Sequence, residues 1–121
     1  MAKFANDLMM DAALDYVATG TILTVCTTQP TTRTEAVTTY ALADVVIDGT
    51  DFTKANGDTS GRKTTVGQQA SVPIDTTGTA THVAISSGSA LLYVTTCTSQ
   101  ALTSGGTVTV PAWDIELSDP S

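Results

Sequence analysis

The stretch ATHVAISSGSALLYVTT, residues 80–96, decides the fold class of this chain. Polarity alternates along it on both sides of Ser87-Gly88, a dipeptide typical of tight turns. Alternation with a period of two is the pattern of a strand that turns one face toward a core. We therefore predict a β-hairpin with strands at 80–86 and 90–96.

His82, the only histidine in the chain, lies in the first of these strands. Val83 and Ile85 are expected to face the core, which places His82 with Ala84 and Ser86 on the more polar face. General acid–base catalysis needs a group that orients the imidazole ring, and a zinc site needs further ligands. Neither pattern surrounds His82, so we predict a surface or interface residue with no catalytic or metal-binding role.

The composition extends the β prediction to the rest of the chain. Threonine makes up roughly a fifth of the 121 residues, and its branched Cβ favours extended backbone. Turn signals recur about every 10 residues, as in small sandwiches and barrels. The predicted segments are strands at 21–28, around Val45–Ile47, at 62–74 and at 107–117, a helical turn at 32–40, a loop at 53–61, and turns at 75–80 and 100–106.

The N-terminal segment has the period of a helix instead. The residues on its expected core face are Phe4, Leu8, Ala12 and Tyr16, with Met9, Ala13 and Val17 beside them. Asn6 or Asp7 can cap the helix, and Thr19-Gly20 supplies a stop. We predict one amphipathic helix over about 6–18, which must pack on the β body because so short a helix is unstable alone in water.

These elements predict a mainly β protein: a small antiparallel β-sandwich or barrel with one N-terminal amphipathic helix. Because no internal repeat or linker interrupts the pattern, residues 1–121 are expected to form a single domain. Its β-rich body would cover residues 21–117, and residues 118–121 would be a frayed tail.

The charge balance excludes one class of partner. Five Lys and Arg against 12 Asp and Glu give a net charge of −7, whereas a nucleic-acid-binding protein needs a basic surface. The N-terminal segment lacks the apolar run of a secretory signal, and no run of about 18 apolar residues predicts a membrane span. We expect synthesis in the cytoplasm and no nucleic-acid or membrane partner.

Residues 48–58 contain the densest group of oxygen ligands in the sequence. The group consists of Asp48, Asp51, Asn56 and Asp58. Calcium prefers oxygen ligands with glycines at the sharp turns between them. Their spacing departs from the calcium-loop pattern, however, and Lys54 lies in their middle. An ordinary polar loop is therefore favoured, with Ca²⁺ binding as the alternative.

Asp114 and Glu116 are a second group that suggests chemistry. They lie two apart on one predicted strand and so share a face, and paired carboxylates act in glycoside hydrolysis. A sugar cleft also needs aromatic platforms, and the chain has one Trp. Packing of Trp113 and Ile115 in the core explains the alternation fully. No catalytic residue, metal or cofactor is expected.

Four segments, read in order, resemble a group of small proteins encoded among the virion structural genes of tailed bacteriophages. They are CTTQPTTRTEA (26–36), DFTKANGDTSGRKTTV (51–66), GTATHVAISSGSALLYVTT (78–96) and SGGTVTVPAWDIELSDPS (104–121). The resemblance implies a virion component without enzymatic activity, either a capsid decoration (cement) protein or a neck, collar or tail accessory protein. The implied partners are the major capsid protein or other virion proteins, and further copies of the chain.

The charged fraction of 14% suits such a role, because few charges lose their hydration at a contact. Weak contacts repeated on a lattice add by avidity. Capsid decoration is favoured over a neck or tail position. A receptor- or glycan-binding module is an alternative from another class, although such sites recruit exposed aromatic residues and few are available.

The two cysteines, Cys26 and Cys97, lack the CxxC spacing of zinc or redox motifs. Two reduced thiols are expected. If their strands lie side by side, the alternative is a disulfide that forms once virions leave the reducing cytoplasm.

Overall fold

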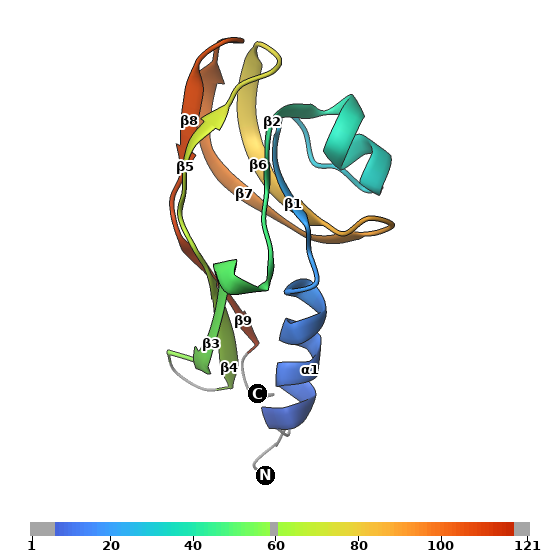
Figure 1. The fold of residues 1–121 in the computed structure, drawn as a ribbon, viewed down its shortest axis with the longest axis vertical. Helices are drawn as coiled ribbons and strands as arrows, with labels where there is room; N and C mark the ends of the chain where they lie inside the picture. Colours follow the sequence, from blue (N-terminus) through green and yellow to red (C-terminus); the bar gives the residue numbers. More distant parts are fainter. Residues whose placement is uncertain (1–6, 59–60, 118–121) are drawn as a thin grey trace.

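The structure, a computed structural model, describes residues 7–58 and 61–117. It is mainly β, with antiparallel sheets and one N-terminal helix, as the sequence predicts. Phe4 and the tail at 118–121 lie outside the described residues. In chain order the elements are α1 (Asp7–Val17), β1 (Ile22–Cys26), η1 (Glu35–Thr39), β2 (Ala41–Val46), η2 (Gly49–Asp51), β3 (Phe52–Asn56), β4 (Arg62–Val66), β5 (Gln69–Pro73), β6 (Gly78–Ser86), β7 (Leu91–Leu102), β8 (Thr107–Val110) and β9 (Trp113–Leu117) (Figure 1).

The largest sheet has four antiparallel strands in the order β2-β1-β6-β7. β6 and β7 form the predicted hairpin, which is closed by a 2.8 Å hydrogen bond from the Ser87 amide to the Ala90 carbonyl. β7 continues to Leu102, where the sequence favoured a turn, and β2 begins at Ala41, before the predicted Val45. The added residues pair beyond the short window that a local pattern covers: Leu102 pairs with Gly78 of β6, and Ala41 pairs with Cys26 of β1.

The inner face of this sheet packs against the two-stranded ribbon β5-β8 (Figure 1). Val83 and Ile85, predicted to face the core, are buried there with Val110 of β8. The ribbon meets the sheet at β2, where Ala43 forms a β-bridge with Ile74. Sheet and ribbon together make the sandwich-like arrangement that the strand pattern predicts.

The outer face of the sheet carries η1, a short helical segment of π type within the predicted helical turn. Ala36 of η1 packs with Cys26 and Ala84, and all three are buried. Ser86 on the same face is also buried. The sequence pattern assigned Ala84 and Ser86 to the more polar face of the strand. The structure buries both residues, and η1 covers this face at Ala84 because it folds back over the sheet from outside the hairpin.

The strands β3, β4 and β9 form a separate sheet against which α1 packs (Figure 1). The prediction of a loop at 53–61 is wrong for its first part. Residues 53–56 belong to β3, because each residue of β3 pairs with a residue of β4. The strands predicted at 62–74 and 107–117 each split in two, the second at Pro111. Proline has no N–H for a ladder and fixes φ, so it ends β8 before the chain enters the other sheet as β9.

The helix α1 turns a different face to the core from the one that its sequence pattern predicts. Met10 and Leu14 are buried, with exposed fractions of 3% and 1%. Leu8 and Tyr16, predicted to be core residues, are 77% and 61% exposed. The helix has apolar side chains on two faces, and its tertiary contacts decide which face is buried.

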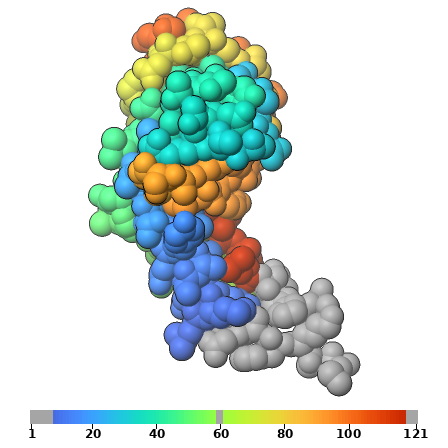
Figure 2. Space-filling view, turned by 90° about the vertical axis from the view of Figure 1, so that its right-hand side faces the viewer, coloured from blue at the N-terminus to red at the C-terminus, as the bar shows by residue number. Residues whose placement is uncertain are grey.

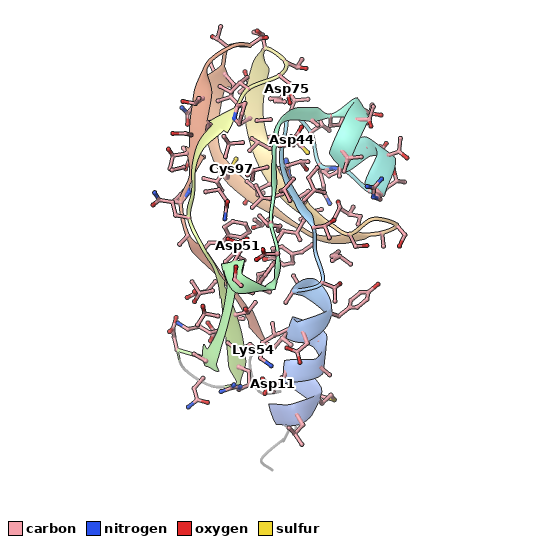
Figure 3. All side chains as sticks on the ribbon, in the orientation of Figure 1. Asp11, Asp44, Asp51, Lys54, Asp75 and Cys97 are labelled. Atoms are coloured by element: carbon pink, nitrogen blue, oxygen red, sulfur yellow. The ribbon has the colours of Figure 1, made fainter. Side chains whose placement is uncertain are left out.

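Two ion pairs and a close approach hold α1 in this orientation. Asp11 pairs with Arg62 of β4 at 2.8 Å, and Asp15 pairs with Lys54 of β3 at 2.7 Å. Figure 3 labels one residue of each pair, Asp11 and Lys54. After the helix, Gly20 lies so near the sheet that a Cβ there would be 2.5 Å from the Ile85 Cγ2 atom. The chain therefore leaves the helix at one defined position against the core.

Candidate functional site

His82 lies on β6 between Cys26 of β1 and Thr96 of β7. The residue is half-buried, and its Nδ1 atom is 2.8 Å from the Thr81 hydroxyl. A threonine hydroxyl is not the charged partner that orients a catalytic imidazole. Within residues 7–58 and 61–117, no three His, Cys, Asp or Glu side chains are grouped to hold a metal ion.

The oxygen ligands of residues 48–58 do not converge on one point. Asp48 and Asp51 each accept a hydrogen bond from a backbone amide and cap η2. Asn56 Oδ1 accepts a hydrogen bond from Arg62 at 2.8 Å, and Asp58 pairs with a lysine on β4. Donors from different elements occupy these oxygens, so this geometry does not favour the Ca²⁺ alternative.

Asp114 and Glu116 on β9 belong to a surface network of hydrogen bonds and ion pairs. Lys63 Nζ lies 2.7 Å from Asp58 Oδ1 and 3.2 Å from Asp114 Oδ2. The Thr65 hydroxyl and Lys63 hold the pKa of Asp114 below its usual value, the hydroxyl contributing most. The acid of a glycosidase needs a raised pKa, so the environment of Asp114 has the opposite effect.

Cys26 and Cys97 are free thiols whose side chains lie on opposite faces of the sheet. Cys26 pairs across the strands with His82, which pairs with Thr96, the residue before Cys97. Cys97 therefore packs against the main core, whereas Cys26 packs under η1. Burial raises the pKa of both thiols. A disulfide within one chain does not fit this arrangement.

Asp44 of β2 interacts with Asp75, which follows β5 (Figure 3). Desolvation of Asp44, followed by its hydrogen bond with Asp75 and the repulsion between them, raises the pKa of Asp44. Asp44 is half-buried and Asp75 is exposed. At neutral pH the desolvated charge of Asp44, with Asp75 beside it, opposes folding.

We expect Asp44→Asn to raise the free energy of unfolding near pH 7 and to leave it unchanged near pH 3. Because its pKa is raised, Asp44 holds its proton more tightly in the folded protein than in the unfolded chain. The free energy of unfolding therefore falls as the pH rises from about 4, the pKa of Asp in the unfolded chain, through the pKa of Asp44 in the folded protein. Urea unfolding at both pH values measures the effect.

Asp48→Ala is the contrasting control. Hydrogen bonds from Thr50 lower the pKa of Asp48, so the Asp48→Ala protein should be less stable than the wild type near pH 7. An Asp44→Asn protein less stable than wild type near pH 7 would contradict an unfavourable charge at Asp44.

The sequence contains a long uncharged stretch that carries no chemical motif but coincides with a surface groove. Residues 76–113 include no Asp, Glu, Lys or Arg, and they form β6, β7 and β8. A groove of about 550 Å³ lies in this part of the molecule. It is lined by Val83, by Thr95–Thr98, and by Val110, Pro111 and Trp113. A smaller hollow of about 210 Å³ shares Cys97 and Val110 with it. The groove offers a partner apolar and hydroxyl groups without charge.

A second surface is the outward face of α1. It consists of Leu8, Met9, Ala12, Ala13 and Tyr16, all of which are exposed. The three large side chains are 77%, 62% and 61% exposed in that order along the chain. In Figure 2 the helix lies uncovered toward the viewer, below the β body. Large apolar side chains gathered on one exposed face are typical of a protein interface.

Comparison of the chain with models of known protein families, with curated proteins and with solved structures gave no match. No helix in the described part of the chain is both long and apolar enough to cross a bilayer. The geometry singles out two surfaces, the outward face of α1 and the uncharged strands β6, β7 and β8.

Proposed function

We propose that this chain is a structural, non-enzymatic component of a tailed-phage virion and that it decorates the capsid as a cement protein. The observation that carries the proposal is the outward face of α1, where Leu8, Met9 and Tyr16 are exposed together. Burying such side chains against another protein is favourable by about 25 cal/mol per Å². The resemblance of four segments to phage virion proteins supplies the context, a protein made in the host cytoplasm and assembled into the virion.

The charges beside the outward face of α1 suit contact with another protein. Asp11 and Asp15 are the acidic residues in the middle of the helix, and they pair with Arg62 and Lys54 of the adjoining sheet. A partner on the outward face therefore meets apolar side chains without burying an unpaired carboxylate, which would be costly. The proposed partner is the major capsid protein or another virion protein.

The small size of this face is compatible with a cement role. A capsid repeats the same binding site many times, so many weak contacts add by avidity. An oligomer of the chain would engage several sites at once and gain more from this effect. No nucleic-acid or membrane partner is proposed.

Immunogold labelling of virions that contain this protein tests its position. Label is expected over the whole capsid surface. Label confined to the neck, collar or tail would overturn the decoration role in favour of an accessory protein at that place. Particles without label would overturn the virion role itself.

Met9→Glu tests the outward face of α1 directly. Met9 is 62% exposed, so the fold should tolerate the change, while a carboxylate buried against a partner should weaken binding by about tenfold or more. Quantitative blotting of purified particles measures the copies retained. Val46→Glu is the matched control, because Val46 is an 80% exposed apolar residue on β2, and it should assemble normally. Normal incorporation of Met9→Glu would show that the contact lies elsewhere.

A glycan- or receptor-binding module is the second candidate, and the exposure of Tyr16 favours it. This ring was predicted to be in the core but is 61% exposed, and an amphipathic aromatic ring suits a half-wet binding surface. A glycan array probed with the purified chain tests this candidate. Binding that is lost in Tyr16→Ala would favour it over the cement role.

A further inference from the structure

We infer that two copies of this chain associate through the free edge of β7, so that their sheets join into one antiparallel sheet across a twofold axis. The inference deepens the proposed function and rests on it for the role of the pair in the virion. Three features of β7 favour the association: its edge position, its lack of charge and the groove beside it.

The edge of β7 is long and open. The strand runs from Leu91 to Leu102 at the end of the sheet order, so within the described residues it pairs with β6 and with no second strand. The side chains of Thr96 and of residues 98–101 are exposed. The N–H and C=O groups along such an edge form a template for pairing with another chain.

Most other strand edges carry features that discourage such pairing, and β8, whose sequence TVTV has none, is four residues long. Lys54 lies on β3, Asp114 on β9 and Pro73 on β5, and charged residues and prolines are the usual protection of an edge. The edge of β2 is covered where Ala43 bridges to Ile74. β7 has no charged residue or proline in its sequence LLYVTTCTSQAL. Its ladder with β6 has two irregularities, between Ala80 and His82 and between Ile85 and Ser86, and such bulges bend a strand without adding charge.

The uncharged sequence of β7 allows a second copy to be the partner despite the acidic net charge. Each chain has a net charge of −7, so two copies repel unless their contact leaves out the acidic residues. Residues 76–113 supply such a contact, and β7 lies within them. Twofold pairing sets this uncharged strand against itself, so no like charges meet. A basic partner, in contrast, would find no carboxylate on β7 to pair with.

The groove beside β7 can receive side chains from the added strand. Its walls include Val83, Cys97 and Val110, and its volume is about 550 Å³. Successive side chains of a strand point to opposite faces of a sheet, so every second residue of the added strand would point toward this side. The second copy of β7 supplies Leu, Val and Thr side chains, which match an uncharged lining.

Analytical ultracentrifugation of the purified chain over increasing concentrations tests the association. The wild-type mass is expected to reach twice the chain mass of 12.4 kDa. Thr98→Lys places ammonium groups on both paired edges and should weaken dimerisation by at least about tenfold. Thr53→Lys is the matched control, because Thr53 is an exposed threonine on the edge strand β3, and this variant should dimerise like the wild type.

Amide hydrogen exchange locates the contact. Exchange at residues 96–101 should slow as the concentration rises, and it should not do so in Thr98→Lys. Three results would overturn the inference: a wild-type monomer at every concentration, a Thr98→Lys dimer of unchanged strength, or protection that appears on α1 instead of β7.

Immunogold labelling separates this inference from the proposed function. A protein that is monomeric in the centrifuge but still labels capsids overturns the edge pairing alone. A β7-paired dimer that labels no part of the particle overturns the virion role alone.

Discussion

Leu14→Ala is expected to lower the free energy of unfolding by about 2–5 kcal/mol. Leu14 has an exposed fraction of 1% and belongs to the core cluster that also contains Leu23 of β1 and Val66 of β4. Truncation removes buried apolar surface and leaves a cavity that the closely packed neighbours fill only in part. Urea unfolding followed by circular dichroism measures the loss.

Leu8→Ala is the matched control, because it removes the same atoms from the same helix. Leu8 is 77% exposed, so the change is expected to stay within about 0.5 kcal/mol of the wild type. The four-residue repeat in the sequence predicts the opposite order, with Leu8 on the core face. A loss at Leu8 as large as that at Leu14 would contradict the orientation of α1 in the structure.

Gly20→Ala is expected to destabilise the fold by about 1–3 kcal/mol. The new Cβ would lie 2.5 Å from Ile85 Cγ2 and 3.2 Å from the Val17 carbonyl oxygen. Ile85 is fully buried, so it can move aside only by disturbing its packed neighbours. Glycine is needed at this position because the chain passes so near the sheet as it leaves α1. Thermal and urea unfolding measure the effect.

Gly88→Ala is the control for Gly20→Ala, because a Cβ at Gly88 meets no atom within 4 Å, and its stability should stay within about 0.5 kcal/mol of the wild type. The double variant Gly20→Ala/Ile85→Ala tests the cause. Removing Cγ2 of Ile85 relieves the close contact, so the double variant should lose less stability than the two single variants together. Strict additivity would show that the contact with Ile85 is not the source of the loss.

The candidate surfaces were only partly visible in the sequence. The absence of charge from residues 76–113 is a local property that counting alone reveals. The exposure of Leu8 and Tyr16 is not a local property. Apolar residues occur on two faces of α1, and periodicity does not say which of the two faces packs against the sheet. The environment of Asp114 was predictable only in part. Its position on a strand follows from the local pattern, but its partners Thr65 and Lys63 come from a strand far away in the sequence.

Local sequence by itself determined the mainly β class, the presence of α1, and the hairpin of β6 and β7. These features depend on side-chain periodicity and turn residues within one short segment, where backbone geometry links pattern to structure. The tertiary structure alone decided the buried face of α1, the strand at Phe52–Asn56, the division of residues 107–117 between two sheets, and the place of β7 at the end of its sheet order. Each of these depends on which distant segments meet, because burial and strand pairing are properties of two surfaces in contact and not of either one alone.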